Sequence, residues 1–315
     1  MGPLSDDDGR AANRASLRVK YKKAVMNLIE ALMSDPKPKY RSDDLMKLRV
    51  TLGSFNPVDQ EFLTSNICLF KPMSSKQIKG YSLDMSRQHE GHRDLCNNYD
   101  KVDKTTTDGL GRPLRSWEIM ERQVVTTFRY LNLHFESSYK ETKRYPESLA
   151  KSANWYPFRE GNPFGDLPRG LLVGRLLTNQ IPQWRVRGRY EWQSNYRKPE
   201  TLLPHMMLVM YTGEDAIEGE LLFCELGCIA QVIYNRLQQK EFENTSLFPV
   251  LLISLFGPRR GRLVQAKFNK SGVLKVRASP IYSFMSKAKA PWDLFLRYHA
   301  CEPRDGPEIE FGDDE

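Results

Sequence analysis

Carboxylates stand beside two apolar runs in the stretch LPHMMLVMYTGEDAIEGELLFCELGCIAQVIYNRLQ, residues 203–238. This pattern predicts two strands, a turn that carries Glu214 and Asp215, and a following helix. Glu225 lies at the end of the second predicted strand, where the apolar run gives way to glycine. A carboxylate in that place is either part of a metal-dependent active site or the solvated end of an ordinary buried sheet. The second interpretation needs fewer assumptions.

Two strands, a helix and a further strand resemble the core of the restriction-endonuclease-like superfamily, named for its PD-(D/E)xK motif. Leu203-Pro204-His205 stands in the place of the Pro-Asp, and Glu225-Leu226-Gly227 in that of the acidic-x-Lys triplet. Gln231 and Tyr234 match the Gln-x-x-Tyr that often accompanies the motif. The resemblance covers residues 170–285 and rests on topology and texture more than on identities.

This resemblance implies a site in which Glu225 and a carboxylate of the turn, such as Asp215, hold Mg²⁺. The ion would activate water for phosphodiester hydrolysis, and Lys267 on a later strand would supply the ammonium group that stabilises charge. Two departures weigh against cleavage, because His205 replaces the Asp of the motif and Gly227 replaces its Lys. We therefore expect a degenerate core that binds nucleic acid without cutting it. An active nuclease with Mg²⁺ as cofactor is the alternative.

A row of arginines marks the run QWRVRGRYEWQ. Arg185, Arg187 and Arg189 alternate, so in a strand all three would project from one face. The other face would then carry Trp184, Val186, Tyr190 and Trp192. A guanidinium row can follow phosphates, and an aromatic residue such as Trp192 can stack on bases. A half-buried strand with a solvated basic face explains the same pattern more simply.

Further cations and the distribution of charge favour a polyanionic partner. The further basic residues are Arg259, Arg260 and Arg262 in GPRRGR, and Arg18, Lys20, Lys22 and Lys23 in RVKYKK. The chain has a net charge of +8, of which residues 1–8 contribute −3 and residues 302–315 contribute −6, so the body carries +17. A basic body of this kind is typical of proteins that bind nucleic acid. The acidic ends could compete for the same surface, so deleting 302–315 is expected to raise the affinity for polyanions.

Composition is typical of a folded protein, with 40% hydrophobic and 11% aromatic residues. No apolar run reaches the roughly 20 residues that span a bilayer, and the N-terminus has no secretory pattern. Five cysteines at scattered spacings argue against a disulfide scaffold and favour an intracellular location, nuclear or cytoplasmic.

Other motifs carry less weight. His89, His92 and Cys96 could ligate zinc, but such a site needs a fourth ligand, and an exposed polar loop explains them more simply. The sequence contains no P-loop, no dinucleotide-binding glycine motif after a strand and no nucleophile elbow, which disfavours a nucleotide-dependent enzyme.

Periodicity supplies the elements that must position these residues. Apolar spacings of three and four predict a helix from Leu17, with Ser16 as its cap, and a core helix over 116–140. Strand patterns begin at 171 with LLVGRLL and recur to residue 284. The predicted regions are a disordered acidic tail (1–14), a helical region (15–150) with a long loop (66–113), a mixed nuclease-like core (151–301) and a second disordered acidic tail (302–315).

We therefore expect an α+β fold with a mixed sheet in the C-terminal half, a helix crossing it and N-terminal helices covering it. The function expected is nucleic-acid binding, to DNA or RNA. The alternative is a regulatory or scaffold protein that binds an acidic protein partner.

Overall fold

The computed structural model describes residues 6–104, 106–141, 146–158 and 184–312, and an eight-stranded mixed sheet lies at its centre. Its strand order is β2-β13-β12-β11-β9-β8-β7, with β14 beside β12. These strands are β2 (Val50–Ser54), β7 (Trp155–Pro157), β8 (Trp184–Gln193), β9 (Leu202–Thr212), β11 (Val250–Phe256), β12 (Arg260–Phe268), β13 (Leu274–Ala278) and β14 (Tyr282–Ser283). β11 is parallel to β9 and β13 is parallel to β2, whereas the other neighbours are antiparallel. The strand predicted over 171–177 lies outside the described residues.

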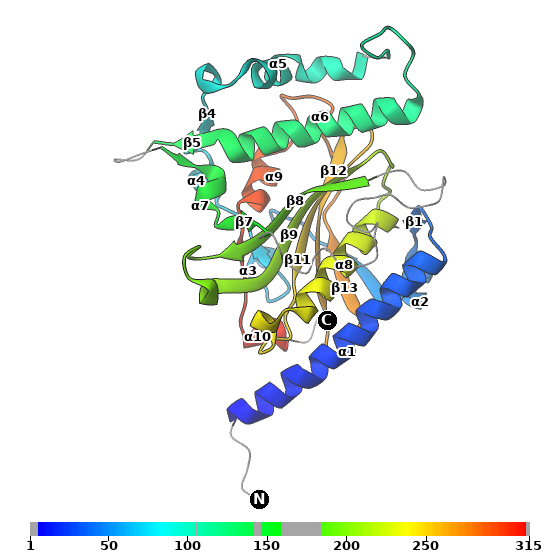
Figure 1. Cartoon of the computed structure of the whole chain (residues 1–315), viewed down its shortest axis with the longest axis vertical. Coiled ribbons are helices and arrows are strands. Elements are labelled where there is room, and N and C mark those ends of the chain that lie inside the picture. Colours follow the sequence, from blue (N-terminus) through cyan, green and yellow to red (C-terminus); the bar gives the residue numbers. More distant parts are fainter. Residues whose placement is uncertain (1–5, 105, 142–145, 159–183, 313–315) are drawn as a thin grey trace, which may run out of the picture.

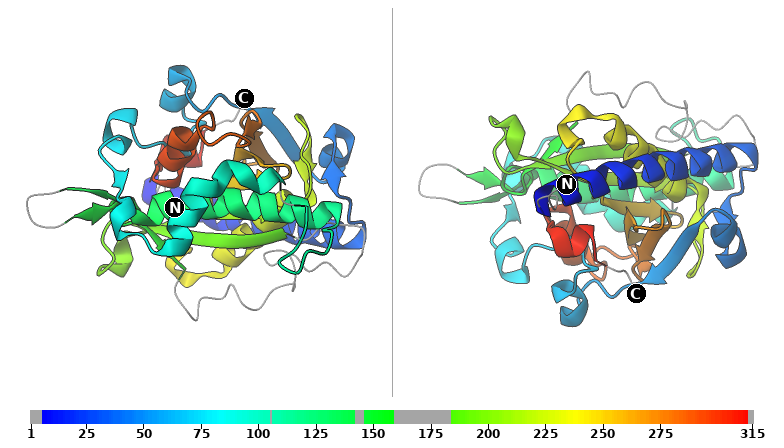
Figure 2. Two further views of the ribbon diagram at one scale, coloured as in Figure 1. Left: turned by 90° about the horizontal axis from the view of Figure 1, so that it is seen from above. Right: turned by 90° about the horizontal axis from the view of Figure 1, so that it is seen from below.

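Helices cover both faces of the sheet. Figure 1 shows α6 on one side of it, and α8 and α1 on the other. The helices are α1 (Asp6–Ser34), α2 (Ser42–Lys47), α3 (Gln60–Thr64), α4 (Ser75–Ile78), α5 (Glu90–Asn98), α6 (Ser116–Ser137), α7 (Leu149–Ser152), α8 (Phe223–Gln238), α9 (Trp292–His299) and α10 (Pro307–Glu310). Seen from above, α5 and α6 face the viewer, and seen from below, α1 does (Figure 2). None of the described helices has the length and apolar character that crossing a membrane requires.

Central strands and a crossover helix follow from long apolar runs. Every residue of β11 is buried, as is expected of a strand covered on both faces. β9 and β11 are parallel neighbours, so the chain must cross over between them, and α8 makes that connection. One apolar cluster lies between the sheet and α1 and α8, and a second lies between the sheet and α6 and α9.

The stripe predicted for the first helix is confirmed. Leu17, Tyr21, Val25 and Leu32 are buried, and the Tyr21 ring stacks on Phe268 of β12 with ring centroids 5.2 Å apart. The stripe therefore fastens α1 along the sheet and leaves the lysines between its members at the surface.

The α+β class with a mixed sheet is confirmed, but several segments predicted as irregular are ordered. Residues 6–14 form the first turns of α1, and 66–113 contains short helices and strands. β2 comes from the region predicted as helical, yet it pairs with β13 of the C-terminal half. The division of the chain at residue 151 stays a prediction.

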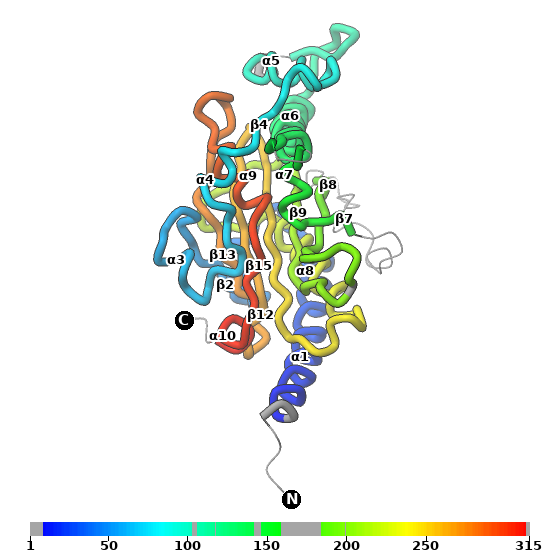
Figure 3. The backbone as a smooth tube through the Cα atoms, turned by 90° about the vertical axis from the view of Figure 1, so that its left-hand side faces the viewer, coloured from blue at the N-terminus to red at the C-terminus, as the bar shows by residue number. Residues whose placement is uncertain are grey.

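The acidic C-terminal segment packs on the body, so the prediction of disorder is wrong for residues 302–312. β15 (Glu302–Pro303) pairs with β3 (Phe70–Lys71), and α10 follows it. Glu310 accepts hydrogen bonds from Arg14 of α1 and from Ser246, and Ile309 is fully buried. Figure 3 shows β15 and α10 running beside the central strands. Apolar burial and ion pairing hold this segment although its net charge is negative.

Smaller elements complete the chain. The remaining strands are β1 (Lys39–Tyr40), which pairs with β10 (Leu221–Leu222), and the three-stranded set β4 (Ser82–Leu83), β5 (Ser138–Lys140) and β6 (Glu147–Ser148). The 3-10 turns are η1 (Met85–Arg87), η2 (Tyr99–Lys104), η4 (Pro199–Thr201) and η5 (Lys240–Phe242).

Candidate functional site

Glu225 lies in the first turn of α8, not at the end of a strand, because the apolar run becomes helical after Leu222. Its Oε2 accepts the backbone N–H of Leu222 at 2.9 Å, and Nε of Arg262 on β12 donates to its Oε1 at 2.9 Å. Both side chains are fully buried. Burial lowers the pKa of Arg262, but the adjacent carboxylate more than offsets this effect, so the pKa is raised overall. Glu225 is therefore half of a buried ion pair that joins α8 to the sheet.

The carboxylates predicted to share Mg²⁺ with Glu225 also face cations. Asp215 pairs with Arg260, and Glu214 lies 3.5 Å from the ammonium of Lys39. A magnesium site needs several oxygen ligands directed at one point. No group of three His, Cys, Asp or Glu residues in the described part of the chain is placed to hold a metal ion. The residues present do not fit the expected ion.

Lys267 is on the opposite face of the sheet from the Glu225 ion pair. It lies five positions after Arg262 on the same strand, and side chains an odd number of positions apart project from opposite faces. Its buried Nζ donates to the carbonyl of Ile309 at 2.6 Å.

The strand pairing also differs from that of the nuclease resemblance. β10 pairs with β1 and not with β9, so the strand pair that the resemblance requires is not formed.

A β-bulge interrupts the arginine row of β8. Val186 pairs with Met210 of β9, and Gly188 pairs with the next residue of β9, Val209. Arg187 is the extra residue between them. Because a bulge puts two residues opposite one, the alternation of side chains reverses from one side of it to the other.

The prediction that three arginines share one face is therefore wrong. Arg185 lies opposite Tyr211 and Arg189 opposite Leu208, and these two partners belong to the apolar clusters on opposite faces of the sheet. The alternate residues divide in the same way, with Trp184 and Val186 packed on the α8 side and Tyr190 and Trp192 on the α6 side. Arg185, Arg187 and Arg189 are all exposed, but they do not form one row.

The arginines of GPRRGR have structural contacts. Arg259 is fully buried, with its guanidinium carbon 3.9 Å from the ring centroid of Tyr99. Arg262 holds Glu225, and Arg260 pairs with Asp215. This turn therefore contributes to the interior and not to a free basic surface.

A different set of cations meets at one cavity. Lys20 and Lys23 of α1, Lys47 of α2 and Arg49 line a cavity of about 310 Å³, which we call the basic cavity. All four are exposed, and within the described residues every charged side chain of the lining is a cation. Leu28, Leu48, Phe268 and Leu274 are the larger apolar residues of its lining. Exposed cations that line a cavity without a carboxylate in its described lining can attract an anion from solution.

The β12–β13 hairpin holds two of these cations in place. Nζ of Lys20 donates to the carbonyl of Lys270 at 2.7 Å, and an Arg49 Nη donates to that of Ser271 at 2.8 Å. Gly272 has a φ of 72°, and a Cβ there would meet Cγ of Lys20 at 3.1 Å. Glycine is required at this turn both for the backbone conformation and for the close approach of α1.

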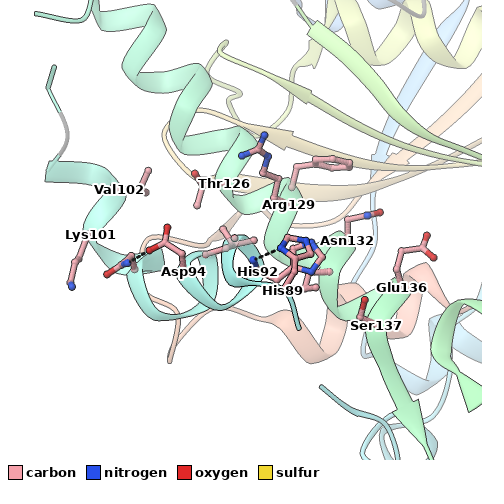
Figure 4. A pocket seen from close by; sticks show the side chains of 15 residues that line it. His89, His92, Asp94, Lys101, Val102, Thr126, Arg129, Asn132, Glu136 and Ser137 are labelled. Atoms are coloured by element: carbon pink, nitrogen blue, oxygen red, sulfur yellow. Dashed lines mark hydrogen bonds between the residues drawn. The ribbon is translucent and has the colours of Figure 1, made fainter. Parts of the chain in front are cut away.

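A larger cavity of about 720 Å³ lies between α5 and α6 and mixes both signs of charge. In Figure 4 the rings of His89 and His92 lie against each other, with Asp94 on one side and Glu136 on the other. Their ring centroids are 3.5 Å apart. The pKa of His92 is lowered, mainly by burial and also by the neighbouring His89. Cys96 is buried in a separate aromatic cluster and does not line this cavity. The zinc alternative gains no support from the described residues.

The sequence predicts about half of the basic cavity. Lys20 and Lys23 belong to the basic run RVKYKK, whereas Lys47 and Arg49 stand in the less basic segment MKLRV, which has no basic run. The usable signal there is two cations at the end of a short helix, next to a turn.

Comparison of the chain with family models, with curated proteins and with solved structures finds no match.

Proposed function

We propose that this protein binds nucleic acid, without cutting it, through phosphates that enter the basic cavity. The observation that carries the proposal is the convergence of Lys20, Lys23, Lys47 and Arg49 on one cavity whose described charged residues are all cations. An Arg guanidinium can bind a phosphate with two parallel hydrogen bonds, and a lysine ammonium adds a mobile point charge. The proposal includes no catalytic step, since the carboxylates expected to hold Mg²⁺ are paired with cations.

The same chemistry would act on several adjacent phosphates. Each phosphate neutralised by the protein releases condensed counterions, so binding should weaken steeply as salt is raised. Because these contacts carry no base information, the proposal does not include sequence specificity.

A binding assay with a charge-reversed variant tests this function. Fluorescence anisotropy with labelled single-stranded and duplex oligonucleotides is measured over a range of salt for the wild type and for Lys20→Glu/Lys23→Glu/Lys47→Glu. We expect the variant to bind at least about tenfold more weakly. Its log–log salt slope should fall by about one unit for each phosphate that the protein no longer neutralises.

Matched controls place the site. The variant Lys76→Glu/Lys79→Glu/Lys151→Glu changes net charge equally at three exposed lysines, which lie on α4, just after α4 and on α7. The variant Arg185→Glu/Arg187→Glu/Arg189→Glu tests the arginines of β8. If either control weakens binding as much as the cavity variant does, or if the wild type does not bind at about 50 mM salt, the proposal is wrong.

A further inference from the structure

β2 forms an unprotected edge of the central sheet. It is the last strand in the described order and pairs only with β13. Its sequence, VTLGS, contains no proline and no charge, and Thr51, Gly53 and Ser54 are exposed. Proteins usually block such edges with charges, prolines or bulges, because free N–H and C=O groups would pair with another strand.

The outward backbone groups of β2 can be assigned from its bonds to β13. The carbonyl of Arg49 accepts from the N–H of Leu274 at 3.0 Å, and the N–H of Phe55 donates to Ala278 at 3.1 Å. In a parallel pair, alternate residues make these bonds. Val50, Leu52 and Ser54 therefore direct their N–H and C=O groups away from β13.

A groove of about 650 Å³ runs along this edge and has opposite charges at its ends. Arg49 immediately precedes β2, and Glu218 lies at the other end, where its Oε1 accepts the N–H of Ile281 just beyond β13. Leu45 and Met46 of α2 form an apolar wall, and Met46 is 74% exposed. An occupant should thus be an extended strand with apolar side chains and the reverse order of charge.

We propose that the occupant is a second copy of this chain, with β2 paired antiparallel to β2 of the partner subunit. A two-fold axis at Leu52 would place Val50 opposite Ser54 of the partner subunit, so all the outward groups are satisfied. The same symmetry would bring Arg49 against Glu218 of the partner subunit, twice in each dimer. The two central sheets would become one continuous sheet.

This dimer goes beyond nucleic-acid binding and does not depend on it. Arg49 lines both the groove and the basic cavity, so two cavities would stand on either side of the dimer axis. If nucleic acid is bound, two linked sites would raise its affinity through effective concentration. The dimer itself is tested without nucleic acid.

A proline at the edge tests the backbone pairing. Ser54→Pro removes an outward N–H but no bond to β13, and Ser54→Ala is the matched control that keeps the N–H. By sedimentation velocity in the micromolar range we expect dimers for the wild type and for Ser54→Ala, and monomers for Ser54→Pro with unchanged circular dichroism. A monomeric wild type, or a dimeric Ser54→Pro variant, overturns the proposal.

A charge swap tests the partner's identity and orientation. Glu218→Arg and Arg49→Glu should each weaken dimerisation by about tenfold or more, because like charges then meet across the axis. The double variant should recover most of that loss, which a local structural defect would not do. Glu90→Arg, at an exposed position on the distant α5 (Figure 1), should leave the dimer unchanged. Failure of the double variant to recover shows that Arg49 and Glu218 do not meet.

Discussion

The face of the sheet under α8 and the basic cavity use the same kind of side chain for different purposes. Under α8, Arg236 and Arg262 have no exposed side-chain surface, and each pairs with one carboxylate, Glu191 or Glu225. At the basic cavity the cations are exposed, and the described charged lining has no carboxylate. A count of arginines therefore does not locate a binding surface. Burial and pairing decide which cations remain available.

The largest effect expected is the loss of one member of a buried pair. Arg262→Ala should lower the free energy of unfolding by about 3–5 kcal/mol, because Glu225 would remain buried without its partner. Urea denaturation followed by circular dichroism measures this change. The double variant Arg262→Met/Glu225→Leu removes both charges and should be close to the wild type. If Arg262→Ala is as stable as the wild type, the interior pair is not the structural contact described.

The next largest effect is a loss of stability in acid, because the protein interior also contains uncharged histidines. Burial lowers the pKa values of His205 and His299 to about 3 each. The unfolded chain binds these protons near pH 6.5 and the folded chain does not. Stability is therefore complete above about pH 6.5 and falls below it, by about 1.4 kcal/mol per pH unit for each histidine.

His299→Phe isolates one of these contributions. The His299 ring stacks on Phe135 with centroids 3.6 Å apart, so a phenyl ring can keep the contact. The variant should lose about 1.4 kcal/mol less than the wild type for each pH unit between about 6.5 and 4.5. Parallel curves of stability against pH for the two proteins would show that His299 does not titrate as described.

A partly buried pair should give an intermediate effect. Arg14 is 29% exposed and Glu310 is 6% exposed, and Glu310 also accepts from Ser246. Burial opposes the ionised form of Glu310, but the bonds from Arg14 and Ser246 prevail and lower its pKa. Glu310→Gln keeps an acceptor and removes the charge, so thermal or urea unfolding should show a loss of about 1 kcal/mol. A loss as large as that of Arg262→Ala would contradict a graded dependence on burial.

The smallest effect on stability is expected at the basic cavity. Lys23→Glu and Lys47→Glu should each change the free energy of unfolding by no more than about 0.5 kcal/mol, since both side chains are solvated. The same variants should weaken oligonucleotide binding at low salt. Large losses of stability here would mean that these lysines are structural, and the contrast between the two regions would disappear.

Much of the fold can be predicted from periodicity, because helices such as 116–137 and strands such as 250–256 bury regular apolar patterns. The run around Glu225 misleads because a short apolar segment can be a buried strand or the start of a buried helix. The bulge at Arg187 has no clear sequence signal, yet it moves the side chains that follow it to the opposite face of the sheet from the one that strict alternation predicts. The acidic C-terminal segment is misread because charge suggests solvation, whereas Ile309 and Glu310 dock into the body.

The candidate site is harder to predict than the fold. Its cations come from α1, from α2 and from Arg49 just before β2, so they belong to no single motif. Lys20 and Arg49 donate to carbonyls of a hairpin 250 and 222 positions away in the sequence. Only the packing of α1 on the sheet brings these segments together, and no local pattern encodes that meeting.

The close contact between Gly272 and Lys20 has a practical consequence. Overlapping synthetic peptides would present the lysines of α1 as an unstructured basic segment, which would bind polyanions non-specifically and only at low salt. Mapping by fragments would thus overstate the importance of RVKYKK and miss Arg49 altogether, so any survey for ligands has to use the intact chain.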